Sequence, residues 1–581
     1  MKTVMKKWTY STTCLLIWAL LCSVKLYAAS SHDALFEVLL DANSHPYFQQ
    51  PLDSSEQAKL KKLYQLNENQ LLWFSSEHPV KTINQLLELY AAAPTQGLNS
   101  DDYAYQYLKS KWLNIQQSNP DFYQFAVFDT ALSLTFIRYL KDLHYGRVAA
   151  KLQGFRLDPK KNIDLASAIY GAIQIGALDS LVADLEPQLK PYQQLKTALV
   201  KYRRLAQQFK QPLHFALKES LHPGDWSSEV SKLRLHLNAL STPIGQAIEP
   251  SIDSNNVYTE DLVIKVKALQ TQHGQLNDGI IGKQTLATLN TPFEHRVEQI
   301  ELAMERLRWI SVPRQSPFIL VNIPAFQLWA FNTEEHNLSD PLTMRVIVGK
   351  AKNRIKPYEK ESKKKALQTP IFTAKLSYLV FNPYWNIPES ILLQEILPLL
   401  EQDPDYLQKN NMEIVSRFAH DAPVYALNET NIQRLYNKQL HLRQRPGRKN
   451  ALGHIKFIFP NNHNIYLHDT PARSLFKRSK RDFSHGCIRV ENPNILAEFV
   501  LSNQSEWNAT KIKQTMRSNK PSIVDVKQKI PVLIFYSTAL PSPAGIAFYP
   551  DIYDHDSALT VALDQRSKIF ATVQTPLLVA F

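Results

Sequence analysis

The sequence has little cysteine. It contains three cysteines in 581 residues, and Cys14 and Cys22 both lie in an apolar run near the N-terminus. We expect that run to be removed as an export signal, which leaves the mature protein with Cys487 and no partner for an internal disulfide. A lone thiol in an exported protein is either a liability or a reactive group. The residues around Cys487 favour a reactive group.

Glycine is also scarce, and long apolar runs are absent after the N-terminus. The 15 glycines fall well below the roughly 7% share of average proteins, and few glycines favour helices over tight hairpins. The apolar fraction of 44% is typical of a soluble globular protein. At 581 residues the chain is long enough for three or four domains with their own cores.

The first 28 residues have the pattern of a secretory signal. Three lysines among the first seven residues precede an apolar core at residues 14–21, and Ala28 or Ala29 offers a cleavage point. The apolar core is too short for a spanning helix. An uncleaved membrane anchor is the alternative, because Leu26 or Tyr27 occupies the position where a small residue is usual. The expected compartment is the cell envelope.

The net charge of +13 raises the question of a nucleic-acid partner. Export argues against one, and the basic residues are dispersed, with local concentrations at residues 360–365 and 443–449. A positive potential would instead attract peptide carboxylates or anionic polymers of the envelope. A basic face that serves only solubility is the alternative for either cluster.

The candidate chemistry centres on a cysteine and a histidine. Cys487 follows Ser484, His485 and Gly486, and His468 stands 19 residues upstream. A free thiol has a pKa of about 8.5 and only its thiolate attacks, so a neighbouring imidazole that takes the proton makes an activated nucleophile. The pattern therefore predicts a nucleophile, Cys487, with His468 as its general base.

Two short strands are expected to bring these residues together. Residues 464–468 alternate as a strand does and residues 469–471 break it, while Pro493 closes a second run that begins at Cys487. The alternation places Tyr466 on the face of His468, and Arg489 on the face of Cys487. Gly486 allows the backbone to approach a bound carbonyl closely, so the amides of Gly486 and Cys487 are candidate oxyanion donors.

Two alternatives compete with this interpretation. A single cysteine in a strand is commonly a small buried hydrophobe. A zinc site built from His463, His468, His485 and Cys487 is the other alternative. No acidic ligand or water-activating glutamate is paired with these residues in the sequence, so we expect neither a metal nor another cofactor.

The same residues carry a family resemblance. His468 followed by residues 484–490 (SHGCIRV) resembles the signature of the YkuD-type L,D-transpeptidase catalytic domain. Longer stretches resemble the YcbB subfamily of periplasmic L,D-transpeptidases, namely residues 344–350 (MRVIVGK), 369–372 (TPIF), 378–388 (YLVFNPYWNIP) and 466–471 (YLHDTP). The resemblance implies a periplasmic protein of a Gram-negative-type envelope.

The resemblance also implies a reaction. Cys487 would attack the carbonyl after the third stem residue of a peptidoglycan tetrapeptide and release D-alanine. The acyl group would then pass to the side-chain amine of a second stem, which makes a 3→3 cross-link. Carbapenems are the implied covalent inhibitors. The implied partners are peptidoglycan stem peptides and glycan, with other cell-wall synthesis enzymes as further candidates.

Further residues are expected to support Cys487 and His468 or to bind the substrate. Asp469, through its backbone oxygen or side chain, is expected to orient His468, and His485 to support the oxyanion wall. Tyr466 is expected to bound the pocket. Arg489 is expected to pair with a stem carboxylate, with an internal acid such as Glu491 as the alternative partner. By resemblance, three residues line the donor groove, with a role as core residues as the alternative: Asn382, Tyr384 and Trp385.

The predicted fold class is multidomain α+β. Helical periodicity fills the first half of the chain, and short β-branched and aromatic runs begin at Pro317. By resemblance these parts are a helical scaffold domain, a small three-helix peptidoglycan-binding domain and a β-rich catalytic domain with a helical capping insertion. The expected boundaries are 1–28 for the signal peptide, 31–208 for the scaffold, 213–292 for the peptidoglycan-binding-like domain, 293–316 for a linking helix, 317–558 for the catalytic domain, 388–442 for the capping insertion and 559–581 for a C-terminal tail.

Three functions remain open from the sequence. The first is the cross-linking L,D-transpeptidase. The second uses the same acyl-enzyme but transfers the acyl group to water or to a protein lysine, as an L,D-carboxypeptidase or a lipoprotein-anchoring enzyme. The third is a non-catalytic scaffold that binds the cell wall. The products made from purified stem peptides distinguish the three.

Overall fold

A computed structural model describes residues 40, 44–75, 77–247, 255–311, 317–332, 341–351 and 367–571. The expected signal peptide, the basic residues 360–365 and the last part of the expected tail, residues 572–581, lie outside this range. Within it, no helix is long and apolar enough to cross a membrane.

The N-terminal part is a helical bundle around one long helix. That helix, α5 (Phe122–Tyr145), begins with a capping box formed by Asp121 and Gln124 and is buried on nearly every side. A helix that is apolar around most of its circumference belongs in the centre of a bundle. The surrounding elements are β1 (Ser44–His45), β2 (Phe48–Pro51), α2 (Ser54–Leu66), α3 (Pro79–Ala91), α4 (Tyr105–Gln117), α6 (Leu165–Gln174) and α7 (Leu178–Leu185).

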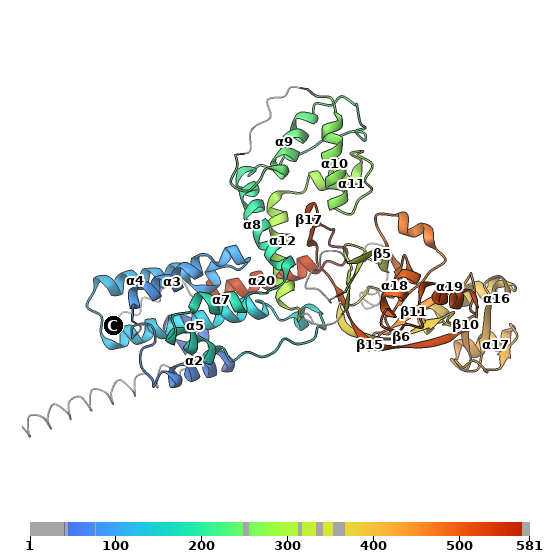
Figure 1. The fold of residues 1–581 in the computed structure, drawn as a ribbon, viewed down its shortest axis with the longest axis horizontal. Helices are drawn as coiled ribbons and strands as arrows, with labels where there is room; N and C mark the ends of the chain where they lie inside the picture. Colours follow the sequence, from blue (N-terminus) through green and yellow to red (C-terminus); the bar gives the residue numbers. More distant parts are fainter. Residues whose placement is uncertain are drawn as a thin grey trace, which may run out of the picture.

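Two further helices connect this bundle with the strand-rich part. Helix α8 (Lys190–Gln208) packs along α12 (Phe293–Arg308), and both contribute side chains to the large core that continues into the β-sheet. Between them lie three helices with a separate small core, α9 (Val230–Ser241), α10 (Glu260–Gln272) and α11 (Lys283–Leu289). Figure 1 shows α9, α10 and α11 projecting from the middle of the molecule, with the N-terminal helices at one end and the strands at the other.

The strand-rich part is built on a nine-stranded sheet. Its order is β13-β5-β14-β12-β11-β6-β15-β3-β4, and β4 also pairs with β5, so eight of the strands form a closed ring. Closure removes exposed sheet edges. The strands are β3 (Phe318–Asn322), β4 (Gln327–Phe331), β5 (Leu342–Gly349), β6 (Phe372–Phe381), β11 (Ile455–Ile458), β12 (Leu467–His468), β13 (Asp482–Ser484), β14 (Ile488–Val490) and β15 (Ser522–Phe535), with helices α18 (Pro493–Val500) and α19 (Ala509–Arg517) after β14.

A hairpin after the sheet touches the three-helix unit. Strands β16 (Ala539–Ser542) and β17 (Gly545–Phe548) pair with each other, and the ring of Phe548 stacks on His273 with centroids 5.8 Å apart. Arg296 of α12 lies over the same Phe548 ring at 4.8 Å. The hairpin is therefore in aromatic contact with the three-helix unit and in cation–π contact with α12.

The insertion after β6 is mixed rather than helical. It contains a four-stranded sheet of order β7-β10-β8-β9, with its own apolar core. The expectation of a helical insertion at 388–442 was therefore wrong in part, because the strands are two to four residues long and are fixed by pairing between distant segments that local periodicity does not reveal. The elements are β7 (Trp385–Asn386), α14 (Glu389–Ile391), the π-helix η5 (Leu392–Ile396), α15 (Leu397–Gln402), α16 (Tyr406–Lys409), β8 (Met412–Val415), β9 (Val424–Tyr425), α17 (Glu429–Tyr436) and β10 (His441–Gln444).

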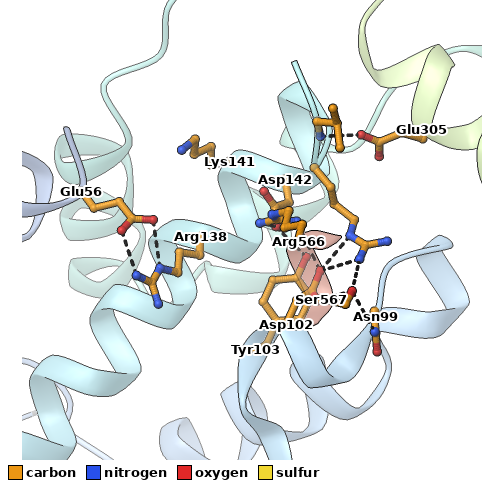
Figure 2. A network of polar contacts seen from close by, with 12 residues as sticks. Glu56, Asn99, Asp102, Tyr103, Arg138, Lys141, Asp142, Glu305, Arg566 and Ser567 are labelled. Carbon is orange, nitrogen blue, oxygen red and sulfur yellow. Dashed lines mark hydrogen bonds and ion pairs between the residues drawn. The ribbon is translucent and has the colours of Figure 1, made fainter. Parts of the chain in front are cut away.

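The C-terminal segment is a helix that returns to the N-terminal bundle. Helix α20 (His555–Ala571) runs through the expected boundary at residue 559, so a separate tail beginning there is incorrect. Figure 2 shows Arg566 of α20 beside Asp142 of α5 and Asp102. The guanidinium of Arg566 is 2.5 Å from the carboxylate of Asp142 and 3.3 Å from the buried carboxylate of Asp102. Ser567 donates to Asp102 at 2.8 Å. The helical bundle and the β-rich part together confirm the multidomain α+β class.

Candidate active site

The candidate residues meet on one face of two neighbouring strands. Strands β12 and β14 are parallel, with Leu467 opposite Ile488 and His468 opposite Arg489. Leu467 and Ile488 point into the large core. Because side chains alternate along a strand, His468 and Arg489 lie on the other face, as the sequence pattern predicts. Cys487 immediately precedes β14 and lies beside Tyr466 on that same face.

Tyr466 is a polar neighbour of the thiol. Hydrogen bonds from the backbone and the side chain of Tyr466 lower the pKa of Cys487, but burial outweighs them and raises this pKa above its usual value. The sulfur also lies 3.7 Å from the carbonyl oxygen of Asn464, and the Cys487 side chain remains only partly buried. The resting thiol is thus protonated at neutral pH and needs a base before it attacks.

His468 is held as a neutral base. Its Nδ1 lies 2.6 Å from the carbonyl oxygen of Asp469, so Nδ1 carries the proton and Nε2 is left with its lone pair. Burial, with the positive charge of Arg489 as the next cause, lowers the pKa of His468 to about 3. No hydrogen bond joins the imidazole to the thiol in this structure, and the two side chains are diagonal neighbours on their common face.

The side chain of Asp469 fixes the backbone rather than the imidazole. Its carboxylate accepts hydrogen bonds from the N–H groups of His454, at 2.8 Å, and Thr470, at 2.6 Å, and pairs with Arg473 at 2.5 Å. It also fills the space where a Cβ on Gly453 would stand, only 2.3 Å away. Of the two expected means of orienting His468, the structure therefore has the backbone oxygen in contact.

Two side-chain hydrogen bonds hold the turn before Cys487. Thr369 donates from Oγ1 to the carbonyl oxygen of Gly486 at 2.7 Å, and Ser484 donates from Oγ to the carbonyl oxygen of Cys487 at 2.5 Å. Gly486 has a φ of +111°, a conformation that residues with a Cβ rarely adopt. Its amide donates to Ser484 Oγ at 3.2 Å, so it is already engaged. The Cys487 amide has no partner among the described residues.

Two cations flank the thiol, and one of them was not predicted. Lys456 on β11 lies opposite His468, with its Nζ 3.8 Å from the ring centroid of Tyr466, and its charge lowers the pKa of Cys487. Burial lowers the pKa of Lys456 itself. The alternation of buried Ile455 and Phe457 was the available signal, because it puts Lys456 on the opposite face.

Arg489 is the second cation, and no carboxylate in the described part of the chain pairs with it. The alternative partner, Glu491, forms its ion pair with Arg345 instead. The Nε of Arg489 is buried without a hydrogen-bond partner within the described part of the chain. A guanidinium that has a buried nitrogen without a partner and lies beside a thiol is suited to receive an acidic group of a ligand.

His485 points away from this face toward the capping insertion. Its Nε2 lies 2.6 Å from Oε1 of Glu395, on the π-helix η5. The expected support of an oxyanion wall by the His485 side chain is therefore replaced by a contact with another part of the protein. Sequence reasoning missed Glu395, which is 90 residues away in the chain.

The three residues predicted to line the donor groove lie in different surroundings. Asn382 is fully buried with a φ of +48°, and its amide nitrogen donates to the carbonyl oxygen of Thr515 at 2.8 Å. Its assignment to the donor groove was wrong, because the left-handed turn directs it inward. Trp385 packs against the core of the insertion, and Tyr384 lies under Arg443 at 4.3 Å, both partly buried.

Two of the four candidate zinc ligands have other partners in the structure. Of the candidate zinc ligands, His463 lies near Arg156 and Phe372, and His485 is bound to Glu395. Across the described ranges, no three residues among histidine, cysteine, aspartate and glutamate form a group that could hold a metal.

Comparison with known proteins identifies two regions. Residues 316–517 match the family model of the L,D-transpeptidase catalytic domain, YkuD, and residues 58–199 match the model of a scaffold domain. The chain is 31% identical over 284 residues to the "Putative L,D-transpeptidase" of Haemophilus influenzae, which covers 48% of this chain and 53% of that protein. The chain thus matches about half the length of this curated relative.

Solved structures give a weaker likeness. An L,D-transpeptidase fragment from Xylanimonas cellulosilytica is 13% identical, covers 55% of this chain and all of that one, and has a TM-score of 0.16. A fused Zn-dependent amidase/peptidase/peptidoglycan-binding protein from Clostridium acetobutylicum is 11% identical, covers 55% of this chain and 99% of that one, and has a TM-score of 0.14. Such scores support no conclusion, and the assignment stands on the sequence matches: this chain contains one region similar to a scaffold domain and a second region similar to the YkuD L,D-transpeptidase catalytic domain.

Proposed function

We propose that this protein is a periplasmic L,D-transpeptidase that forms 3→3 cross-links between peptidoglycan stem peptides. The observation that carries the proposal is the common face of β12 and β14, on which a partly exposed thiol stands with a neutral imidazole and two cations. The match to the catalytic-domain family supports the reaction class.

In the first half-reaction the donor stem acylates the enzyme. His468 takes the thiol proton at Nε2, and the sulfur of Cys487 attacks the carbonyl carbon of the third stem residue. The C–N bond to the terminal D-alanine then breaks, and the proton passes from the imidazolium to the leaving amine. The products are a thioester on Cys487 and free D-alanine.

In the second half-reaction an amine replaces the sulfur. The side-chain amine of an acceptor stem attacks the thioester carbonyl and loses a proton to His468. The C–S bond breaks, the new amide is released, and the proton returns to the sulfur. The carbonyl of Asp469, at 2.6 Å from Nδ1, holds the imidazole in the tautomer that both steps require.

Charge around the thiol suits both the thiolate and the substrate. Lys456 and Arg489 favour the ionised sulfur, and the free amide of Cys487 is the candidate donor to the oxyanion. Gly486 is a weaker candidate for this role, because its amide is bound to Ser484. Arg489 is the proposed partner of a stem carboxylate, since no acid among the described residues pairs with its guanidinium.

The three-helix unit is the proposed glycan-binding module. Ser479, in the segment between His468 and Cys487, donates from Oγ to Oε1 of Gln284 on α11 at 3.2 Å. A glycan strand held by the module would therefore deliver its stem peptides close to the thiol. Tethering of this kind raises the local concentration of a polymeric substrate.

Product analysis tests the proposal. Purified protein is incubated with disaccharide-tetrapeptide monomers, and the products are separated and weighed by mass spectrometry. We expect dimers linked through third residues, with release of one D-alanine per dimer, and none with Cys487→Ala. Tripeptides without dimers would indicate a carboxypeptidase, wall-linked lipoprotein an anchoring enzyme, and unchanged monomers a non-catalytic scaffold.

A further inference from the structure

The capping insertion and the sheet are two separately packed bodies. The insertion has its own core, which includes Leu397, Ile414 and Leu442, whereas the sheet shares its core with α8 and α12. The chain passes between them near Pro383 and near Asn450, whose Nδ2 donates to the carbonyl oxygen of Pro383 at 2.9 Å. Two bodies with independent cores joined at one end can change their relative position without unpacking either core.

One polar contact joins the free side of the insertion to the sheet. Within the described residues, one pair makes a hydrogen bond or ion pair between residues 389–443 and the nine-stranded sheet with its loops. This pair is Glu395 and His485, whose Oε1 and Nε2 are 2.6 Å apart. Both side chains are partly exposed, at 29% for His485 and 49% for Glu395. The contact is therefore accessible to solvent and can break without exposing a buried charge.

The contact between Glu395 and His485 lies close to Cys487, because His485 stands two residues before it in the sequence. Two hydrogen bonds fix the backbone next to His485. Ser484 Oγ donates to the carbonyl oxygen of Cys487, and Thr369 Oγ1 donates to the carbonyl oxygen of Gly486. The His485 side chain is thus presented outward from a rigid turn. Glu395 meets it from η5, a π-helical turn, and such turns are frequent where a helix must aim one side chain at a functional site.

We propose that Glu395 and His485 form a latch that holds the capping insertion over Cys487 while the acyl-enzyme waits for its amine. The inference rests on the proposed transpeptidase function and adds the residues that control its outcome. When the latch opens, water reaches the thioester. Attack by water breaks the C–S bond, returns the proton to the sulfur and yields a tripeptide carboxylate in place of the cross-linked amide.

Substitutions at Glu395 test the latch through the partition of the acyl group. With tetrapeptide monomers as substrate, Glu395→Ala should raise the ratio of tripeptide to dimer at least threefold. Glu395→Gln keeps an acceptor oxygen for Nε2 and should stay within twofold of the wild-type ratio. The matched control is Glu401→Ala, which removes a carboxylate of the same insertion that binds Tyr436 and should leave the ratio unchanged.

Hydrogen exchange separates failure of the latch from failure of the proposed function. Glu395→Ala should increase amide exchange in residues 389–402 several-fold, and Glu401→Ala should not. If the wild type makes no product but exchange responds in this way, the latch stands and the proposed reaction is wrong. If Glu395→Ala matches Glu401→Ala in both the product ratio and exchange, the latch is refuted.

Discussion

His468 and Arg489 face each other across the parallel strands β12 and β14, and the guanidinium is one reason that the pKa of His468 falls to about 3. A histidine with so low a pKa is unprotonated throughout the neutral range. The imidazole is therefore unprotonated but a weak base in this buried position, so ionisation of the Cys487 thiol depends on the charges beside the sulfur. Lys456 and Arg489 provide the positive charge that favours this ionisation.

Replacing Lys456 by methionine should slow alkylation of Cys487. The positive charge of Lys456 lowers the pKa of the thiol, so its loss leaves less thiolate at a given pH. We expect the rate of iodoacetamide alkylation at pH 7.5 to fall severalfold and the pH profile to move to higher pH. Lys375→Met, which removes an exposed lysine from β6, is the control. Equal rates in both variants would contradict the role of Lys456.

Replacing Gly453 by alanine should disturb the support of His468. A Cβ there would lie 2.3 Å from the carboxylate of Asp469, and φ is +61°. Gly154 is the matched control, because its φ is +79° and nothing lies within 4 Å of a Cβ placed on it. Both variants should lose about 1 kcal/mol from backbone strain. Only Gly453→Ala should lose more than this from its free energy of unfolding, measured in urea. Only Gly453→Ala should also lose acylation, measured as the carbapenem adduct.

Removing Arg566 should destabilise the contact between α20 and the helical bundle. The variant Arg566→Ala leaves the buried carboxylates of Asp102 and Asp142 with one less cation. Breaking such a pair costs about 3–5 kcal/mol. The control Arg417→Ala breaks an exposed pair with Asp421 and should cost under about 1 kcal/mol. Chemical unfolding of both variants checks the difference, and similar losses would argue against α20 as a structural anchor.

Acid should destabilise the protein well above the pH at which carboxylates titrate. Burial lowers the pKa of four histidines, to about 3 for His45, His273 and His468 and to about 4 for His236. The unfolded chain binds protons at these positions below about pH 6.5 while the folded chain does not, so their contribution is complete above pH 6.5 and declines as the pH falls.

Three buried carboxyls work in the opposite direction, because burial also raises the pKa values of Asp102 and Asp551. Burial raises the pKa of Asp129 to about 6, so the folded chain gains a proton there before the unfolded chain does and is stabilised as the pH falls. The four histidines outnumber these three carboxyls, and their pKa values fall from the usual 6.5 to about 3 or about 4. The free energy of unfolding in urea should therefore be lower at pH 5 than at pH 7, and equal or higher stability at pH 5 would show that these histidines are not buried as neutral groups.

The strand alternation in the sequence was sufficient to pair Tyr466 with His468 and Cys487 with Arg489, and the register between β12 and β14 puts both pairs on one face. It worked because the spacing of side chains along a strand is local and fixed. The same rule could have added Lys456, had residues 455–458 been treated as the next strand. The helices were predictable for the same reason, since apolar spacing in α5 and α12 is a property of neighbouring residues.

Contacts between distant segments could not be predicted. Asn382 was assigned to the groove because nothing in its neighbourhood reveals a φ of +48° or the carbonyl of Thr515 that receives its side chain. The Gly486 amide was expected to be free, and only the folded turn brings Ser484 Oγ to it. Glu395 and the docking of α20 depend in the same way on pairs far apart in the chain.

The most direct test of the account is the chemical identity of the acylated residue. Wild-type protein is mixed with tetrapeptide monomers, quenched in acid within the first turnovers, digested and analysed by mass spectrometry. We predict a thioester of the donor tripeptide on the peptide that contains Cys487, absent from Cys487→Ala and strongly reduced in His468→Ala. A wild-type protein that makes cross-linked dimers with no adduct on Cys487, or with an adduct on another residue, would contradict the account.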